Sequence, residues 1–137
     1  ALGQQPLNAP SVFNFFRPGY MPPNTAMAVQ GLVAPEFQLV HETSVAGYMN
    51  FMQSVIAAGR GGVRANYNTE LALAQDAEAL TQHLNLVLCA NRMSSAAFTT
   101  IRDAVNSINA RTDAGRRSRV YAAILMTMCC PDYLIQK

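Results

Sequence analysis

The chain has 137 residues, of which 50% are hydrophobic and 13% are charged, and its formal net charge at pH 7 is +2. This length suits one ordinary domain, and the composition excludes a disordered segment, because disordered chains combine high charge with few apolar residues. The small net charge gives no reason to expect nucleic acid or an anionic membrane as a partner, and no apolar run is long enough for a transmembrane helix.

Residues 1–35 are predicted to form a proline-rich extended arm. Six of the seven prolines lie there, and Arg17 is the only charged residue of this segment. Proline fixes φ and lacks a backbone donor, so the segment can form neither a long helix nor a central strand. The arm nevertheless carries aromatic side chains that a solvated linker would lack: Phe13, Phe15, Phe16 and Tyr20. Two interpretations are open: it covers helices of this chain, or it packs against a region outside it.

Residues 36–137 are predicted to form an all-α domain with four main helices and short helical turns. Pro35 and Glu36 suit the first turn of the first helix, which ends near Gly59, a residue that forms a left-handed cap easily. Between them, apolar residues recur at steps of three and four from Val45 to Ile56. A short helix over residues 69–75 is expected next, capped by Asn68.

The central helix is predicted over residues 77–92, with Asp76 as its cap. Its polar residues form a narrow stripe, and apolar residues cover most of the remaining surface, which is typical of a central helix. The stripe contains Glu78, Gln82, Asn85 and Arg92, and the apolar part includes Leu80, Leu84, Leu86 and Val87.

Two further long helices are predicted towards the C-terminus. Ser94 or Ser95 caps the first, whose core face carries Phe98, Ile101, Val105 and Ile108. Gly115 precedes the second, Pro131 ends it, and residues 132–135 form a closing helical turn. Because no hairpin signal and no alternating strand pattern occurs, the predicted class is all-α.

No motif in the chain predicts catalysis, and no metal or other cofactor is expected. The glycines after Gly59 lack the preceding strand and the Lys-Ser/Thr pair of a phosphate-binding loop, which favours a helix cap and linker. His41 and Glu42 are adjacent, so on a helix their side chains point about 100° apart and do not meet one ligand. His83 is expected to be a partly buried, hydrogen-bonded histidine. No zinc-ligand spacing is present.

Serine and cysteine patterns also favour structural roles. Ser94 and Ser95 lie in neither of the nucleophile motifs Gly-x-Ser-x-Gly and Ser-x-x-Lys, so a helix cap is expected. Cys129 and Cys130 lie in an apolar run, and with Cys89 they are expected to be buried thiols and no disulfide framework.

The single basic cluster contains four arginines within nine residues: Arg111, Arg116, Arg117 and Arg119. We expect a solvated helix start with local ion pairs, since Asp103 and Asp113 are close in sequence. The alternative is a site for phosphate groups or an acidic partner, for which Arg116 and Arg117 are the candidates.

Three stretches resemble the C-terminal part of a large bacterial family catalogued as domain of unknown function eighteen hundred. They are residues 10–20 (PSVFNFFRPGY), 31–38 (GLVAPEFQ) and 131–136 (PDYLIQ). The resemblance covers essentially the whole chain. The resemblance implies that the chain corresponds to the final third or less of a longer protein. Many members of the family carry an export signal, so the resemblance also implies a periplasmic or extracellular location. It supplies no catalytic residue, because the family's tryptophan- and histidine-bearing helix motif has no counterpart here.

These observations predict a structural or interaction domain at the C-terminus of a larger exported bacterial protein. Candidate contact residues are Phe13, Phe15, Phe16, Tyr20, Arg116 and Arg117. The expected partner is the N-terminal remainder of its own precursor or another copy, and the resemblance adds a co-encoded exported protein. The alternative is part of a hydrolase whose active site is completed by the N-terminal region, with His41 or Glu42 contributing. Whether the chain belongs to an enzyme is left open.

Overall fold

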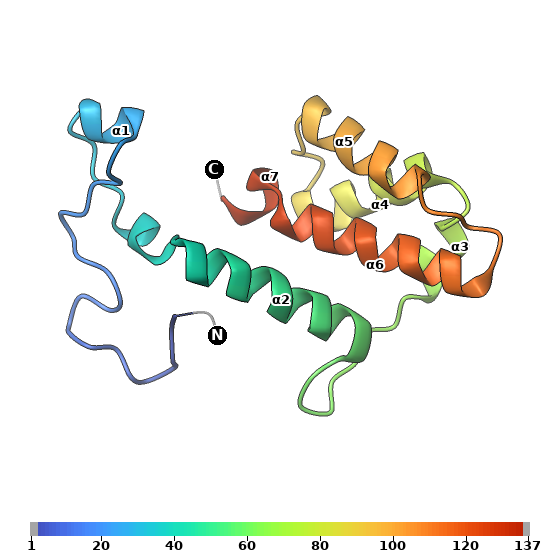
Figure 1. Ribbon diagram of the computed structural model, residues 1–137, viewed down its shortest axis with the longest axis horizontal. Coiled ribbons are helices and arrows are strands. Elements are labelled where there is room, and N and C mark those ends of the chain that lie inside the picture. Colours follow the sequence, from blue (N-terminus) through green and yellow to red (C-terminus); the bar gives the residue numbers. More distant parts are fainter. Residues whose placement is uncertain (1–2, 136–137) are drawn as a thin grey trace. The chain divides into compact units, whose positions relative to one another are not determined.

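The computed structural model describes residues 3–135, and within them the protein is all-α, as predicted. No strand occurs in this part of the chain, only the isolated bridges Ser11–Asn14 and Arg60–Val63. In chain order the elements are α1 Ala26–Val29, the 3-10 helix η1 Pro35–Leu39, α2 Glu42–Ala58, α3 Asn68–Leu73, α4 Ala77–Cys89, α5 Ser95–Asn106, α6 Asp113–Cys129 and α7 Pro131–Leu134 (Figure 1). The long helices α2, α4, α5 and α6 are the four main helices expected.

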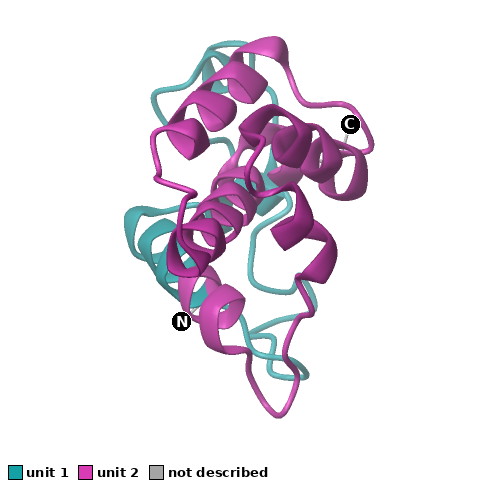
Figure 2. Cartoon of the chain, turned by 90° about the vertical axis from the view of Figure 1, so that its right-hand side faces the viewer, with its two compact units in different colours: residues 1–51 teal, residues 52–137 magenta. Residues whose placement is uncertain are grey.

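The chain divides into two compact units, Ala1–Phe51 and Met52–Lys137 (Figure 2). This division falls within α2, and a boundary between an arm and a helical domain at residue 35 stays a prediction. The first two residues of the predicted arm and the last two of the predicted domain, Gln136 among them, lie outside the described residues.

In the first unit, the proline-rich segment forms turns instead of regular structure. Backbone bonds between residues three apart close three of these turns, donated by Asn8, Asn14 and Tyr20. The backbone N–H of Ala34 donates to the Tyr20 carbonyl at 2.8 Å, so the two ends of the α1 loop are held together. The segment contains the four-residue helix α1 and no longer one, as its prolines predict.

The predicted continuous helix from Pro35 to Gly59 is wrong, because the chain breaks between η1 and α2. Ser44 causes the break: its hydroxyl accepts from His41 N–H at 3.1 Å, while His41 Nδ1 accepts from Ser44 N–H at 3.3 Å. This reciprocal pair resembles a capping box and starts a new helix at Glu42. The predicted end is confirmed, since Gly59 has φ +74° and a Cβ there would lie 2.3 Å from the Val63 carbonyl oxygen.

In the second unit, two of the predicted caps are confirmed. The Asp76 carboxylate accepts from Glu78 N–H and Ala79 N–H at 2.9 and 3.0 Å, and the Ser94 hydroxyl accepts from Ala97 N–H. The prediction of Asn68 as a cap is wrong. Asn68 is the first residue of α3, and its backbone N–H donates a hydrogen bond to the side-chain oxygen of Asn66.

Helix α4 is central, as predicted, because it contacts α3, α5, α6 and α7. The predicted division of α4 into a polar stripe and an apolar surface is partly wrong. Asn85 is buried and its side-chain oxygen accepts from Met93 N–H at 3.1 Å, whereas Leu86 and Val87 are 56% and 60% exposed. The helix ends at Cys89, before the predicted residue 92, because Ala90 adopts φ +50°. Asn85 thus bonds the loop that leads into α5.

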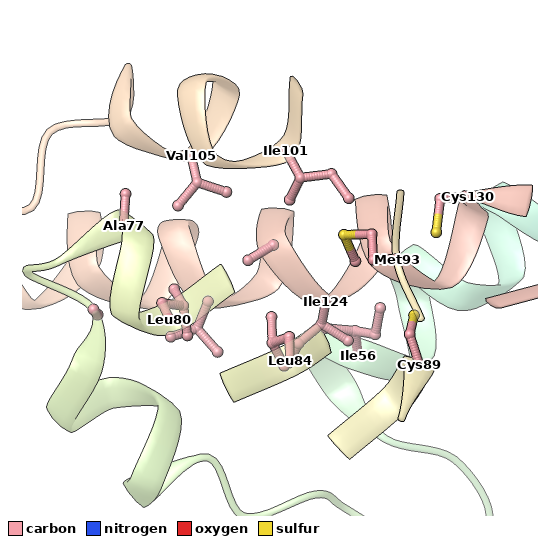
Figure 3. Close-up of a cluster of buried hydrophobic side chains, with 13 residues drawn as sticks. Ile56, Ala77, Leu80, Leu84, Cys89, Met93, Ile101, Val105, Ile124 and Cys130 are labelled. Carbon is pink, nitrogen blue, oxygen red and sulfur yellow. The ribbon is translucent and has the colours of Figure 1, made fainter. Parts of the chain in front are cut away.

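The hydrophobic core of the second unit lies between α4, α5 and α6 (Figure 3). Ile101 and Val105 of α5 point towards α6, and Ile124 of α6 lies beside Leu84. Leu80, Val105 and Val120 are fully buried. The core consists of Ile56, Ala74, Ala77, Leu80, Leu84, Cys89, Met93, Ile101, Val105, Val120, Ala123, Ile124 and Cys130.

Gly115 is predicted to precede the last long helix, but helix α6 begins at Asp113 and contains Gly115, because Thr112 caps it. The Thr112 hydroxyl accepts from Gly115 N–H at 3.0 Å. A Cβ at position 115 would lie 1.9 Å from the Asn109 carbonyl oxygen, so glycine is needed where the α5–α6 loop crosses this turn. The end of α6 at Cys129, just before Pro131, is as predicted, and a closing helical turn is present; this turn, α7, covers Pro131–Leu134 and so begins one residue before the predicted 132–135.

Candidate functional site

The four arginines around the start of α6 have different environments. Arg119 is buried, at 6% exposed, so the predicted solvated helix start is wrong at this position. Arg116 forms an ion pair with Asp113, the local pairing that the sequence predicts. Asp103 pairs with Arg102 instead of with this cluster. Arg111 and Arg117 are exposed.

Arg119 joins the C-terminal ends of two helices. Its Nη1 donates to the carbonyls of Ala74 and Gln75 at 3.2 and 3.1 Å, just beyond α3. Its Nη2 and Nε donate to the carbonyls of Asn106 and Ile108 at 3.0 and 2.6 Å, at the end of α5. Carbonyls at a helix C-terminus lack intrahelical donors and carry partial negative charge. A guanidinium supplies both the missing hydrogen-bond donors and a compensating positive charge.

The spacing of residues in α6 could have predicted that Arg119 is buried, although its place among other arginines suggests exposure. Arg119, Ala123 and Thr127 recur at steps of four, and the latter two have 0% exposure. All three therefore lie along one stripe of α6, the stripe that faces the core. Because Arg119 is buried and Arg116 is paired with Asp113, Arg111 and Arg117 are, within residues 3–135, the exposed, unpaired arginines of this cluster.

A groove runs along α3 and the first half of α6. It consists of two adjacent hollows, of about 500 and 670 Å³, which share Asn68, Leu71 and Arg117 on their walls. Arg64 lines the first hollow, and the Arg116–Asp113 pair lines the second. We refer to these two hollows together as the α3–α6 groove.

Two tyrosines form the aromatic wall of the first hollow. The rings of Tyr67 and Tyr121 pack edge to face with centroids 5.7 Å apart. The Tyr67 hydroxyl donates to the Ile56 carbonyl at 3.1 Å, and burial, with smaller effects of Tyr121 and Glu70, raises the pKa of this phenol above its ordinary value. Tyr67 therefore stays protonated at neutral pH and serves as a wall, not as a base.

The two histidines belong to different units, and each has a local role. His83 Nε2 lies 3.1 Å from Glu70 Oε1, and both side chains are mostly buried, which confirms the hydrogen-bonded histidine expected here. His41 belongs to the other unit, where it caps α2 beside the exposed Glu42. Within residues 3–135 no group of three His, Cys, Asp or Glu side chains is placed to hold a metal ion.

The cysteines are free thiols, of which Cys89 and Cys130 are buried and Cys129 is half-buried. Burial, followed by the neighbouring Cys130, raises the pKa of Cys89 to about 11. Burial likewise raises the pKa of Cys129. Because the thiolate is the reactive form, both groups are unreactive at neutral pH, as structural thiols are.

The aromatic residues of the arm differ in exposure. Phe13 is 55% exposed, and its neighbour Val12 is 93% exposed. Phe15, Phe16 and Tyr20 are half-buried. The arm therefore presents an apolar surface whose most accessible aromatic side chain is Phe13.

Comparison with known proteins identifies a family. A family model described as "Protein of unknown function (DUF1800)" matches residues 1–135. No match was found to a curated protein or to a solved structure. Over the described residues, none of the helices has the length and apolar character that crossing a membrane requires.

Proposed function

The chain belongs to the DUF1800 family of proteins of unknown function, and we propose that it acts as an interaction domain within that family. In this proposal it is the C-terminal part of a larger exported protein, and its first unit docks on another polypeptide surface. The resemblance of residues 10–20, 31–38 and 131–136 to the C-terminal part of family members supports the location within a longer chain.

The observation that carries this proposal is the missing core of the first unit. Among residues 3–51, only Pro22 and Ala34 are buried. Eleven large hydrophobic side chains of the same segment are exposed: Leu7, Val12, Phe13, Met21, Val29, Leu32, Val33, Phe37, Val40, Val45 and Met49. About 50 residues without an apolar core do not form a stable domain alone, so this unit needs another surface.

Charge supports the same conclusion. The first 51 residues contain three charged side chains, those of Arg17, Glu36 and Glu42. Depletion of charge with retained aromatic residues is the composition of the centre of a protein interface. Phe13, Phe15, Phe16 and Tyr20 are the anchors we propose, because buried aromatic side chains contribute most of the binding energy in many interfaces.

The proposal is tested on the full chain with an apolar-to-polar variant of the arm. We expect the wild type to bind an apolar dye or to self-associate in light scattering, and Val12→Ser with Phe13→Ser to reduce both. Val63→Ser, at a 75% exposed loop position of the second unit, is the matched control and leaves both unchanged. A monomeric wild type that binds no dye would contradict the proposal.

The hydrolase alternative makes a different prediction. If His41 or Glu42 contributed to a reaction, His41→Ala would abolish an activity of the longer protein while leaving the α2 helix content nearly intact. His41 has a structural role at the α2 start, so a His41→Asn variant, which keeps a capping side chain, is the necessary control. An activity lost in both variants would favour the enzyme over the interaction domain.

A further inference from the structure

We infer that the α3–α6 groove binds an acidic peptide segment through Arg64 and Arg117. This site lies wholly in the second unit, and its assignment does not depend on the proposed role of the arm. The ligand class is a polypeptide that carries carboxylates next to apolar side chains.

The charge of the first hollow is the main reason. Two arginines line it and no carboxylate does. Among residues 3–135, neither the Arg64 nor the Arg117 guanidinium makes a hydrogen bond or ion pair with another side chain. The first hollow is therefore lined by two arginines whose charges no described side chain neutralises. A guanidinium can bind a carboxylate through two parallel hydrogen bonds.

The second hollow continues this positive surface. Its one carboxylate, that of Asp113, is already bound to Arg116, so it does not neutralise Arg117. Arg117 lines both hollows and lies where they adjoin. An extended ligand that follows the groove thus meets Arg64 first and Arg117 next, with the Arg116–Asp113 pair beyond.

The remaining walls suit a peptide better than an isolated small anion. Besides the arginines, the first hollow is lined by the apolar residue Leu71, the aromatic residue Tyr121 and the amide-bearing residue Asn68. These groups can cover an apolar side chain and bond a peptide backbone, as the walls of recognition grooves do. A bare phosphate would use the cations and leave this apolar wall exposed to water.

Binding is measured by fluorescence anisotropy with the full chain and a labelled peptide in which glutamate alternates with phenylalanine. The control peptide has glutamine in place of each glutamate. We expect the acidic peptide to bind, the control peptide to bind at least about tenfold more weakly, and the affinity to fall as salt is raised, because exposed charges are screened.

Variants of the chain locate the site. Arg64→Gln combined with Arg117→Gln is expected to weaken binding about tenfold or more, whereas Arg111→Gln changes it less than about twofold. Arg111 is exposed and lines neither hollow. Arg111→Gln is therefore a control that removes one positive charge, as each target substitution does, without changing the groove. Circular dichroism checks that the variants fold, which we expect because both target residues are exposed.

Three results would overturn the inference. The first is equal binding of the acidic and glutamine peptides. The second is an unchanged affinity in the double variant. The third is complete displacement of the peptide by inorganic phosphate at constant ionic strength, which would show a simple anion site. The arm variant Val12→Ser with Phe13→Ser is expected to keep full peptide binding, which separates this site from the arm.

Discussion

Replacing Arg119 with methionine tests whether one side chain holds the ends of α3 and α5. The methionine side chain is long, flexible and apolar, so it fills much of the space of the arginine side chain but has no hydrogen-bond donor. The substitution leaves four carbonyls without the guanidinium: those of Ala74, Gln75, Asn106 and Ile108. Because all four belong to helix ends or the residues just beyond, both helices are expected to fray.

The magnitude follows from the burial of these four bonds. The bond to Ala74 is buried and the other three are partly buried. A buried carbonyl left without a donor costs about 1–3 kcal/mol, and each partly buried one costs less because water reaches it. We therefore expect the free energy of unfolding to fall by about 3–5 kcal/mol, the combined cost of one buried and three partly buried carbonyls that lose their donor.

Two variants separate this role from a general effect of charge. Arg119→Lys keeps the cation but loses the planar fork, so it is expected to lose about half as much stability as the methionine variant. Arg117→Met removes an exposed charge two positions away, and its effect is expected to stay within about 0.5 kcal/mol.

Urea unfolding followed by circular dichroism gives the three free energies. Hydrogen exchange then shows where stability is lost, and we expect faster exchange at the C-terminal turns of α3 and α5 in Arg119→Met. A loss of less than about 1 kcal/mol in Arg119→Met, or faster exchange only within α6, would show that Arg119 does not hold the two helix ends.

Other positions make independent predictions. Gly115→Ala is expected to cost at least about 2 kcal/mol in urea unfolding, because its Cβ would meet the Asn109 carbonyl oxygen at 1.9 Å, while Gly19→Ala, in open space, changes little. Asp76→Ala is expected to cost about 1 kcal/mol, since two N–H groups of α4 lose their acceptor, and Asp76→Asn retains most of it. Folding raises the pKa of the Cys89 thiol from 9.0 to about 11, so stability is full below pH 9 and falls as pH rises towards 11; a Cys89→Ser variant with the same pH profile would contradict this.

Local features of this fold could be predicted from the sequence because their causes are local. The caps at Asp76 and Ser94 depend on a side chain and the N–H groups two or three residues later. The end of α2 at Gly59 depends on a positive φ that glycine tolerates. The break before α2 also has a local cause: the reciprocal hydrogen bonds of His41 and Ser44 interrupt the helix, although the pattern of apolar residues continues across them.

Polar residues inside the fold were harder to predict, because their partners are distant in sequence. Asn85 looks like part of a solvent-facing stripe until the turn after α4 brings Met93 N–H to its side chain. The exposure of Leu86 and Val87 has the same origin, since the helix faces that α3, α5, α6 and α7 occupy are decided by tertiary packing. Arg119 bonds to carbonyls 44 and 45 residues away.

The α3–α6 groove shows why a basic cluster in a sequence is a weak guide to a binding site. The sequence groups Arg117 with Arg116 and Arg119, whereas the structure gives these residues three roles: a free cation in the groove, a partner of Asp113 and a support for two helix ends. Arg64 looks like the flank of a glycine-rich linker. It shares a hollow with Arg117 because α3 packs against α6. A charge pattern that matters for binding therefore forms only after folding has buried one arginine and neutralised another.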